Sequence, residues 1–376
     1  MNFLMVVILI WKSFDILVSL IAQSAIPYLG FFSYGDTMFQ YGLPSFIRAL
    51  SNFDGIMYVR IATKGYSMTE QAYFPLYPQL IRGLNMIIHN PIIAGVVISV
   101  TMSIVGLILL VKYLPYLTES KYVKWILLAL LCYPVSYYFG VMYTESLFFA
   151  LMIATLLSLA NKRYLLSGIL GYLLALTRVQ GVFILIPIAI TAFGLMRSGK
   201  VWWKNILVGL GPILGLGTYL TYLWVSLGDP IYFVHAQESF GAHRSSKLIL
   251  LPQVFYRYFK IFWTADMNFQ YYVAVLEFAF MVFAIILLAY DLYLTLKRKN
   301  INWERLGINI FSWANILVPA MTGTLTAMPR YTLMSLSIFL VVGEFKSKWL
   351  KYGMFTTFVI FHVIMLTLFI QGYYVT

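Results

Sequence analysis

The charged residues between positions 53 and 82 have the types and spacing that could do chemistry. This stretch carries Asp54, Arg60, Lys64, Glu70 and Arg82, whereas most of the chain runs for long distances without any charge. Residues 54, 58, 61, 62 and 65 share one face at helical spacing, which predicts a short amphipathic helix lying at a membrane surface. Gly65 is then placed to end this helix, and residues 70–73 to form a turn.

Asp54 stands at the start of that predicted helix, and two interpretations of it are compatible. An aspartate there can cap the helix by accepting hydrogen bonds from the first free N–H groups. A carboxylate held at a lipid–water boundary can also act as a general base on a hydroxyl group. Capping would fix the position of the side chain, so both roles can belong to one residue.

Aromatic residues gather around these charges. The group consists of Tyr58, Tyr66, Tyr73, Phe74 and Tyr77. Tyrosines at membrane interfaces are ordinary belt residues, and this accounts for most of the aromatic residues of the chain. Flat rings with polar edges also suit the C–H faces of sugars, which is the second interpretation of the cluster.

Further along the chain, ionisable residues lie at the ends of predicted helices. Glu145 opens a helix, where an acid is favourable, and Arg178 closes another, shortly before Gln180. Arg330 lies in a similar position. Basic groups near membrane depth usually have a partner, so Arg178 pairs with Glu145 or Asp54, or else these arginines bind phosphate, which suits their bidentate fork. The pattern leaves both alternatives open for Arg178 and Arg330.

A second polar stretch spans residues 228–270. It contains His235, Gln237, Glu238, His243, Arg244, Lys247, Arg257 and Lys260. These residues suit a solvated loop, and a basic loop beside lipid also suits an anionic head group. The two histidines with Glu238 between them are too weak a pattern to predict a metal site.

The composition places these residues in a membrane protein. Of the 376 residues, 61% are hydrophobic and 10% charged, against about 25% charged in soluble proteins. We therefore predict an all-α, polytopic transmembrane protein, since a barrel would show alternating segments of about 10 residues. The net charge of +13 falls between apolar runs, so it orients the loops and predicts no nucleic-acid partner. The single Cys132 excludes an intramolecular disulfide.

Eleven apolar runs are candidates to span the membrane. They are residues 2–27, 91–111, 123–138, 144–160, 164–178, 180–196, 204–227, 271–296, 305–322, 331–344 and 351–370. The first is expected to remain uncleaved, and Lys12 and Asp15 within it to pair. With the N-terminus cytoplasmic, the inner loops collect most of the basic residues, Arg305 included. Residues 1–376 then form one membrane domain with two long outer loops, 28–90 and 228–270.

The motif stretches resemble the GPI mannosyltransferase 2 (PIG-V-like) family. The family pattern, approximately W-D-x-x-x-Y-x-x-I-A-x-x-G-Y followed by F-x-P-L-Y-P, is similar to residues 53–66 and 73–78, with Phe53 in place of the usual Trp. Similar stretches follow in order: Tyr143–Ser146, Leu176–Arg178 with Gly181, Gln237 before Phe240-Gly241, and Met328–Tyr331. The matches run from residue 53 to residue 331.

The resemblance implies an inverting GT-C glycosyltransferase that moves a sugar, often mannose, from a polyprenyl phosphate on the outer side of the membrane. It implies that Asp54 is the catalytic base, and we expect no cofactor. The expected partners are membrane lipid, the lipid-linked sugar donor and a glycan or glycolipid acceptor. The predicted substrate-binding residues are Tyr58, Arg60, Tyr77, Glu145, Arg178, Gln180, Gln237, Arg244 and Arg330. The alternative is a transporter or flippase for a lipid-linked or amphipathic solute, although the charges cluster at the outer helix ends and no repeat is visible.

Overall fold

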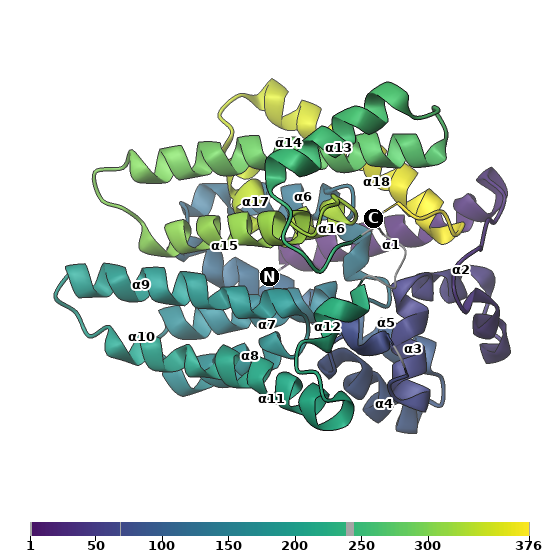
Figure 1. Ribbon diagram of the computed structural model, residues 1–376. Coiled ribbons are helices and arrows are strands. Elements are labelled where there is room, and N and C mark those ends of the chain that lie inside the picture. Colours follow the sequence, from purple (N-terminus) through teal and green to yellow (C-terminus); the bar gives the residue numbers. More distant parts are fainter. Residues whose placement is uncertain (1, 68, 238–243, 376) are drawn as a thin grey trace.

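The computed structural model describes residues 2–67, 69–237 and 244–375, and these residues form helices and connecting loops without a strand (Figure 1). Six helical segments are long and apolar enough to cross a membrane. They cover Phe3–Ala25, Pro91–Tyr116, Val179–Arg197, Trp203–Leu227, Phe269–Leu296 and Lys348–Ile370. The structure therefore confirms an all-α protein with six helices that could span a membrane.

Four of the other five predicted spans are shorter in the structure, and the fifth, residues 305–322, corresponds to the 18-residue helix Trp303–Ala320, which is not among the six. Within residues 123–138, the α-helix α6 covers only Val123–Cys132, because Pro134 cannot continue it, and a short 3-10 helix follows at Ser136–Phe139. The apolar helices α7 (Glu145–Ala160) and α8 (Tyr164–Ala175) have 16 and 12 residues. Near the C-terminus, α17 (Leu336–Glu344) has nine residues. A spanning helix needs about 20 residues when it stands upright, so the count of eleven stays a prediction.

The bundle is built by close approach of small residues. Helix α5 (Pro91–Tyr113) packs along α7, where a Cβ on Gly106 would come within 2.7 Å of the Phe149 ring. Helix α11 (Leu210–Leu227) packs on α8, where a Cβ on Gly211 would meet the carbonyl oxygen of Gly168 at 2.0 Å. Small residues at helix interfaces let backbones approach, which is the usual means of helix association in lipid.

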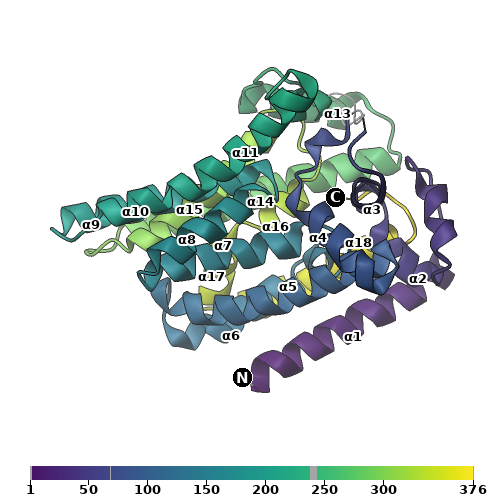
Figure 2. The ribbon, with the colours of Figure 1, turned by 90° about the horizontal axis from the view of Figure 1, so that it is seen from below.

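The first helix, α1 (Asn2–Ala25), lies along one edge of the bundle (Figure 2). It packs on α18 (Lys348–Ile370). The predicted pairing within α1 is confirmed, since Lys12 Nζ lies 3.4 Å from Asp15 Oδ2. His362 of α18 joins the pair, with its Nε2 2.9 Å from Asp15 Oδ1. Polar contacts between two apolar helices thus hold α1 against the bundle.

The first predicted loop is largely helical. It contains α2 (Ser45–Arg48), α3 (Asp54–Lys64) and α4 (Leu76–Ile88). Helix α3 is the predicted amphipathic helix, and its face of Tyr58, Ile61 and Ala62 is buried. As predicted, Gly65 ends it: its φ is 80° and its N–H donates to the carbonyl of Ile61. The structure therefore confirms the predicted helix that begins at Asp54 and its end at Gly65.

The remaining helices surround the region that α3 faces. Helix α9 (Leu185–Arg197) packs on α15 (Trp303–Ala320), and α14 (Phe269–Leu296) packs on α15 and α17. The second predicted loop contributes α12 (Tyr232–His235) and α13 (Leu251–Thr264), and α13 lies on α14. The short α16 (Met328–Leu333) packs between α14 and α15.

Candidate active site

A cavity of about 930 Å³ opens where the two long predicted loops meet the ends of several helices. Its polar wall contains Asp54, Tyr58 and Tyr73 from the first loop and Arg178 and Gln180 from the segment after α8. The second loop contributes Gln237, Arg244, Arg257 and Tyr258, α14 contributes Glu277, and α16 contributes Arg330 and Tyr331. Seven of the ten predicted site residues therefore line one cavity.

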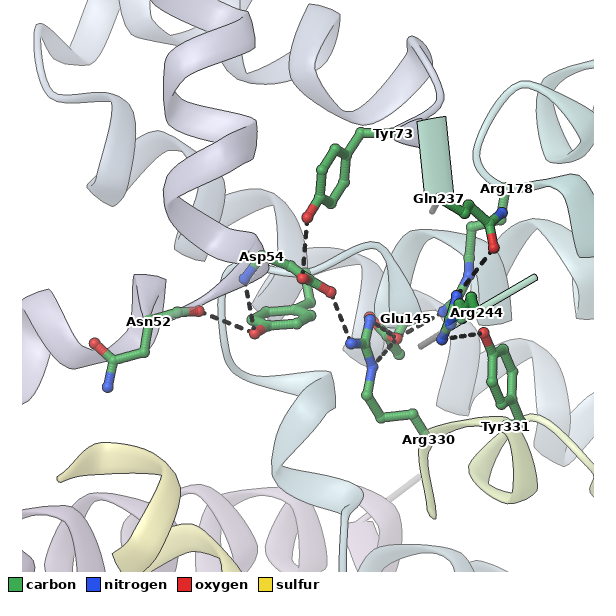
Figure 3. Close-up of polar contacts among 10 residues, drawn as sticks. Asn52, Asp54, Tyr73, Glu145, Arg178, Gln237, Arg244, Arg330 and Tyr331 are labelled. Atoms are coloured by element: carbon green, nitrogen blue, oxygen red, sulfur yellow. Dashed lines mark hydrogen bonds and ion pairs between the residues drawn. The ribbon is translucent and has the colours of Figure 1, made fainter. Parts of the chain in front are cut away.

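Asp54 is held by side chains from distant parts of the chain (Figure 3). Its Oδ2 lies 2.7 Å from Arg330 Nη1, and its Oδ1 accepts a hydrogen bond of 3.1 Å from the Tyr73 hydroxyl. Burial, and then the charge of Asp54, raise the pKa of Tyr73 well above its usual value, so this hydroxyl keeps its proton and donates. Each carboxylate oxygen has a second lone pair, and the side chain is 25% exposed, so Asp54 can still accept a proton from the cavity.

The capping role predicted for Asp54 is wrong. Phe53 is the residue before the first turn of α3, and no side chain caps that turn. The backbone N–H of Asp54 donates instead to the hydroxyl of Tyr143, 3.2 Å away. The carboxylate turns away from its own helix because Arg330 and Tyr73 offer it a charged and a neutral donor in the cavity wall.

The backbone just before Asp54 is strained. Phe53 has φ 57° and ψ −113°, a conformation that favours glycine. Its ring is surrounded by those of Phe32, Phe369 and Tyr374, with centroids 4.7–5.8 Å away. The side-chain amide of the fully buried Asn52 also donates to the carbonyl of Phe369 at 2.8 Å. These contacts with the C-terminal end of α18 fix the direction in which Asp54 leaves the backbone.

Glu145 lies behind the cavity wall as the fully buried first residue of α7. Its Oε1 lies 2.6 Å from Arg178 Nη1 and 2.9 Å from Arg330 Nη2. The ion-pair interpretation of Arg178 and Arg330 is therefore confirmed. Glu145 does not line the cavity, and it holds two arginines in place. Its contact with substrate stays a prediction.

Two further arginines line the cavity without an acidic partner among the described residues. Arg244 donates to Gln237 Oε1 at 3.2 Å and to the hydroxyl of Tyr331 at 3.3 Å. Arg257 donates to the carbonyl of Gly323 at 3.1 Å. A guanidinium has five N–H donors, so both retain donors for a bound anion.

Two predicted site residues lie elsewhere. Arg60 is 2.9 Å from Glu70 Oε1, and its guanidinium lies over the Tyr34 ring, 3.4 Å from the ring centroid. Tyr77 is fully buried, and its hydroxyl bonds to Ser99 at 2.7 Å and to the carbonyl of Gly95 at 3.0 Å. Neither side chain lines the cavity, and both make contacts within the protein, so their contact with substrate stays a prediction.

Sequence reasoning missed several residues of the cavity. Glu277 is an acid inside an apolar helix, a signal that usually marks function and could have found it. Tyr258 carries no comparable signal, because tyrosine is abundant in this chain. Tyr73 and Tyr331 belong to the motif stretches, but nothing in the sequence gives their hydroxyl groups a role. The Tyr73 hydroxyl is the second donor to Asp54.

The second loop contains the two histidines, His235 and His243, whose spacing is a weak pattern for a metal site. His235 Nδ1 lies 2.7 Å from Asp229 Oδ2, at the surface. Glu238, His243 and the Phe240-Gly241 pair of the family resemblance lie outside the described residues. Within the described ranges, no three side chains of His, Cys, Asp or Glu gather as a metal site would require.

No protein-family model matches the chain, and neither does any curated protein.

Proposed function

We propose that this protein is a membrane glycosyltransferase. It moves a sugar, mannose by the motif resemblance, from a polyprenyl-phosphate donor to a hydroxyl of a lipid- or cell-envelope-linked acceptor. The observation that carries the proposal is the position of Asp54, whose carboxylate faces a cavity of about 930 Å³ that also contains Arg244 and Arg257, two cations without an acidic partner among the described residues.

Asp54 is the base of the proposed reaction. It takes the proton of the acceptor hydroxyl as the hydroxyl oxygen bonds to the anomeric carbon of the sugar. The bond between that carbon and the phosphate oxygen breaks, and its electron pair stays on the lipid phosphate. This leaving group is already an anion, so the reaction needs no strong general acid. A glycosidase would need two carboxylates flanking the scissile bond, about 5–10 Å apart.

Arg244 and Arg257 bind the phosphate in this proposal. Arg178 and Arg330 are neutralised by Glu145 and Asp54, so they contribute less positive charge to a ligand. Fixed cations aimed at the leaving phosphate stabilise the charge that grows on it during transfer. Arg330 keeps a different task, because it holds the Asp54 carboxylate at 2.7 Å in the cavity wall.

The rest of the cavity supports an amphiphilic donor. Besides the charged residues, the lining includes the apolar residues Phe31, Ile261, Phe269, Val273 and Ala274. The cavity thus offers both cations for a phosphate and apolar surface for a hydrocarbon chain. We place the cavity at the outer face of the membrane, with a cytoplasmic N-terminus, following the distribution of Lys and Arg. In a bacterium this membrane is the plasma membrane.

The test is sugar transfer by purified protein in detergent or vesicles, with radiolabelled polyprenyl-phosphate mannose and extracted envelope glycolipids as acceptors. The wild type should form a labelled glycolipid, and Asp54→Asn should lose this activity while remaining folded. Asp36→Asn is the matched control, because Asp36 is an exposed aspartate of the same loop. A wild type that moves the intact lipid-linked sugar across vesicles without a covalent product would replace the proposal with a flippase.

A further inference from the structure

The second predicted loop is fastened to the turn that precedes α16. The backbone N–H of Ser245 donates to the carbonyl of Thr322 at 2.8 Å, and that of Ile249 donates to Met321 at 2.8 Å. Arg257 donates to the carbonyl of Gly323 at 3.1 Å, where φ is 98° and a Cβ would meet the arginine. Residues 321–323 are therefore bonded to the second loop at three successive positions.

Tyr258 holds the following part of the same turn, residues 323–327. Its hydroxyl accepts a hydrogen bond of 2.9 Å from the backbone N–H of Leu325 and donates to Glu277 Oε2 at 2.7 Å. Glu277, on α14, is only 4% exposed, and its carboxylate also faces the backbone N–H of Ala327. One tyrosine and one carboxylate thus hold the turn from two different helices, α13 and α14.

The turn decides where Arg330 lies. Ala327 has a φ of 68°, an unfavourable value for a residue with a Cβ, and directly precedes α16. Arg330 follows three residues later, and its backbone N–H donates to the carbonyl of Ala327 at 3.0 Å. The other end of α16 is held separately, by Asn315 at the carbonyl of Tyr331 and by Tyr133 at Thr332. Only the N-terminal end of this short helix depends on the turn.

We infer that Tyr258 and Glu277 are positioning residues, which set Arg330 against Asp54 and Glu145 by holding residues 323–327. Without them the strained Ala327 can relax, and the N-terminal turn of α16 shifts with Arg330 on it. Arg330 carries the ion pair that orients Asp54, so a shift there misplaces the base. The consequence for catalysis rests on the proposed glycosyl transfer, whereas the structural linkage does not.

The linkage is tested by hydrogen–deuterium exchange of Tyr258→Phe in detergent. This variant removes the acceptor of the Leu325 N–H, so peptides covering residues 323–331 should exchange at least about tenfold faster, while those of α7 stay unchanged. Tyr256→Phe is the matched control, because Tyr256 is an exposed tyrosine two residues away on α13. Unchanged exchange at residues 323–331 in Tyr258→Phe would overturn the inference.

Two substitutions of Glu277 distinguish a local effect from a general failure to fold. Glu277→Ala should accelerate the same peptides more than Glu277→Gln, because glutamine keeps one oxygen that can accept from Tyr258. Equal effects of the two substitutions, spread over all helices, would indicate general destabilisation and contradict a local positioning role. These exchange measurements need no activity, so they decide the linkage even if the wild type transfers no sugar.

Measurements of sugar transfer test whether Tyr258 affects catalysis through Arg330. Tyr258→Phe should lower kcat between about tenfold and about a hundredfold, as expected of a misplaced catalytic group, and leave both KM values within about twofold. In the background of Arg330→Lys, Tyr258→Phe should add little further loss, because both changes disturb one contact. Fully multiplicative losses would show that Tyr258 does not act through Arg330.

Discussion

Two clusters of buried charges lie at different ends of the helices, and they differ in what their donors are used for. In one, Arg305 is fully buried and its guanidinium is shared between Asp291 and Glu344, with contacts of 2.6–2.9 Å. In the other, Arg178 and Arg330 share Glu145, and Arg330 also holds Asp54 at the wall of the large cavity.

The first cluster, around Arg305, is closed, in the sense that its charged groups are bonded to other protein groups. Asn309 donates to the second oxygen of Asp291, and Thr118 donates to Glu344, so the carboxylates are satisfied by protein groups. Glu344 borders a smaller cavity of about 770 Å³, but its side chain is 15% exposed and accepts three hydrogen bonds, two from Arg305 and one from Thr118, whereas Asp54 is 25% exposed and accepts two. Sequence reasoning treated Arg305 as a loop residue that sets orientation, and the structure shows instead an internal ion-pair network.

The second cluster is open. Asp54 retains lone pairs toward the cavity, and Arg244 and Arg257 line the same cavity without an acidic partner among the described residues. Burial of charge alone therefore does not mark an active site. An active site is marked by unused donors and acceptors that face a cavity, because only these groups are free to bind a ligand or to transfer a proton.

The largest effect should come from the open cluster. Asp54→Asn removes the proposed base, and we expect a loss of about 10²–10⁴-fold in kcat with little change in the thermal unfolding midpoint. The measurement is sugar transfer beside a thermal scan in detergent. If Asp291→Asn in the closed cluster reduces kcat of the folded protein as much as Asp54→Asn does, the distinction between the two clusters is wrong.

Removing the central cation of the closed cluster should affect stability instead. Arg305→Ala leaves Asp291 and Glu344 buried without their partner, which costs about 3–5 kcal/mol. We expect a lower yield of monodisperse protein in size-exclusion chromatography and a lower unfolding midpoint. Any folded fraction should keep the wild-type kcat, and a selective loss of activity with normal stability would contradict the division between the clusters.

The partnerless arginines should act on the donor. Arg244→Gln and Arg257→Gln each remove a hydrogen-bonding cation, and we expect KM for the polyprenyl-phosphate sugar to rise by about tenfold, since one contact to a charged group contributes about 1.5–3 kcal/mol. KM for the acceptor should stay unchanged. An equal rise in acceptor KM would show that these residues shape the whole cavity and do not bind the phosphate specifically.

The smallest effect is expected at Tyr77. Tyr77→Phe loses the hydrogen bonds to Ser99 and Gly95, which costs about 1 kcal/mol of stability. We expect kcat and both KM values to stay within about twofold of wild type, as measured in the same transfer assay. A tenfold loss of activity would instead support the predicted contact of Tyr77 with substrate.

Local features were predicted well from the sequence because they depend on neighbouring residues. The helix at residues 54–64 with its stop at Gly65, the start of α7 at Glu145 and the pairing of Lys12 with Asp15 all follow from spacing within a few positions. The pairing of Arg178 with Glu145 was one of two open alternatives. Its choice required the actual packing of α7 beside the end of α8.

By itself, the sequence determined the all-α membrane class and the segment that carries the candidate base, because hydrophobicity and helical period are properties of the chain. Only the tertiary structure decided what Asp54 touches, since Arg330 stands 276 positions away and Tyr73 reaches it from a different turn. The structure also decided which arginines are neutralised and which remain for a ligand. Charge pairing depends on distances of a few ångström between helices, and no spacing along the chain encodes those distances.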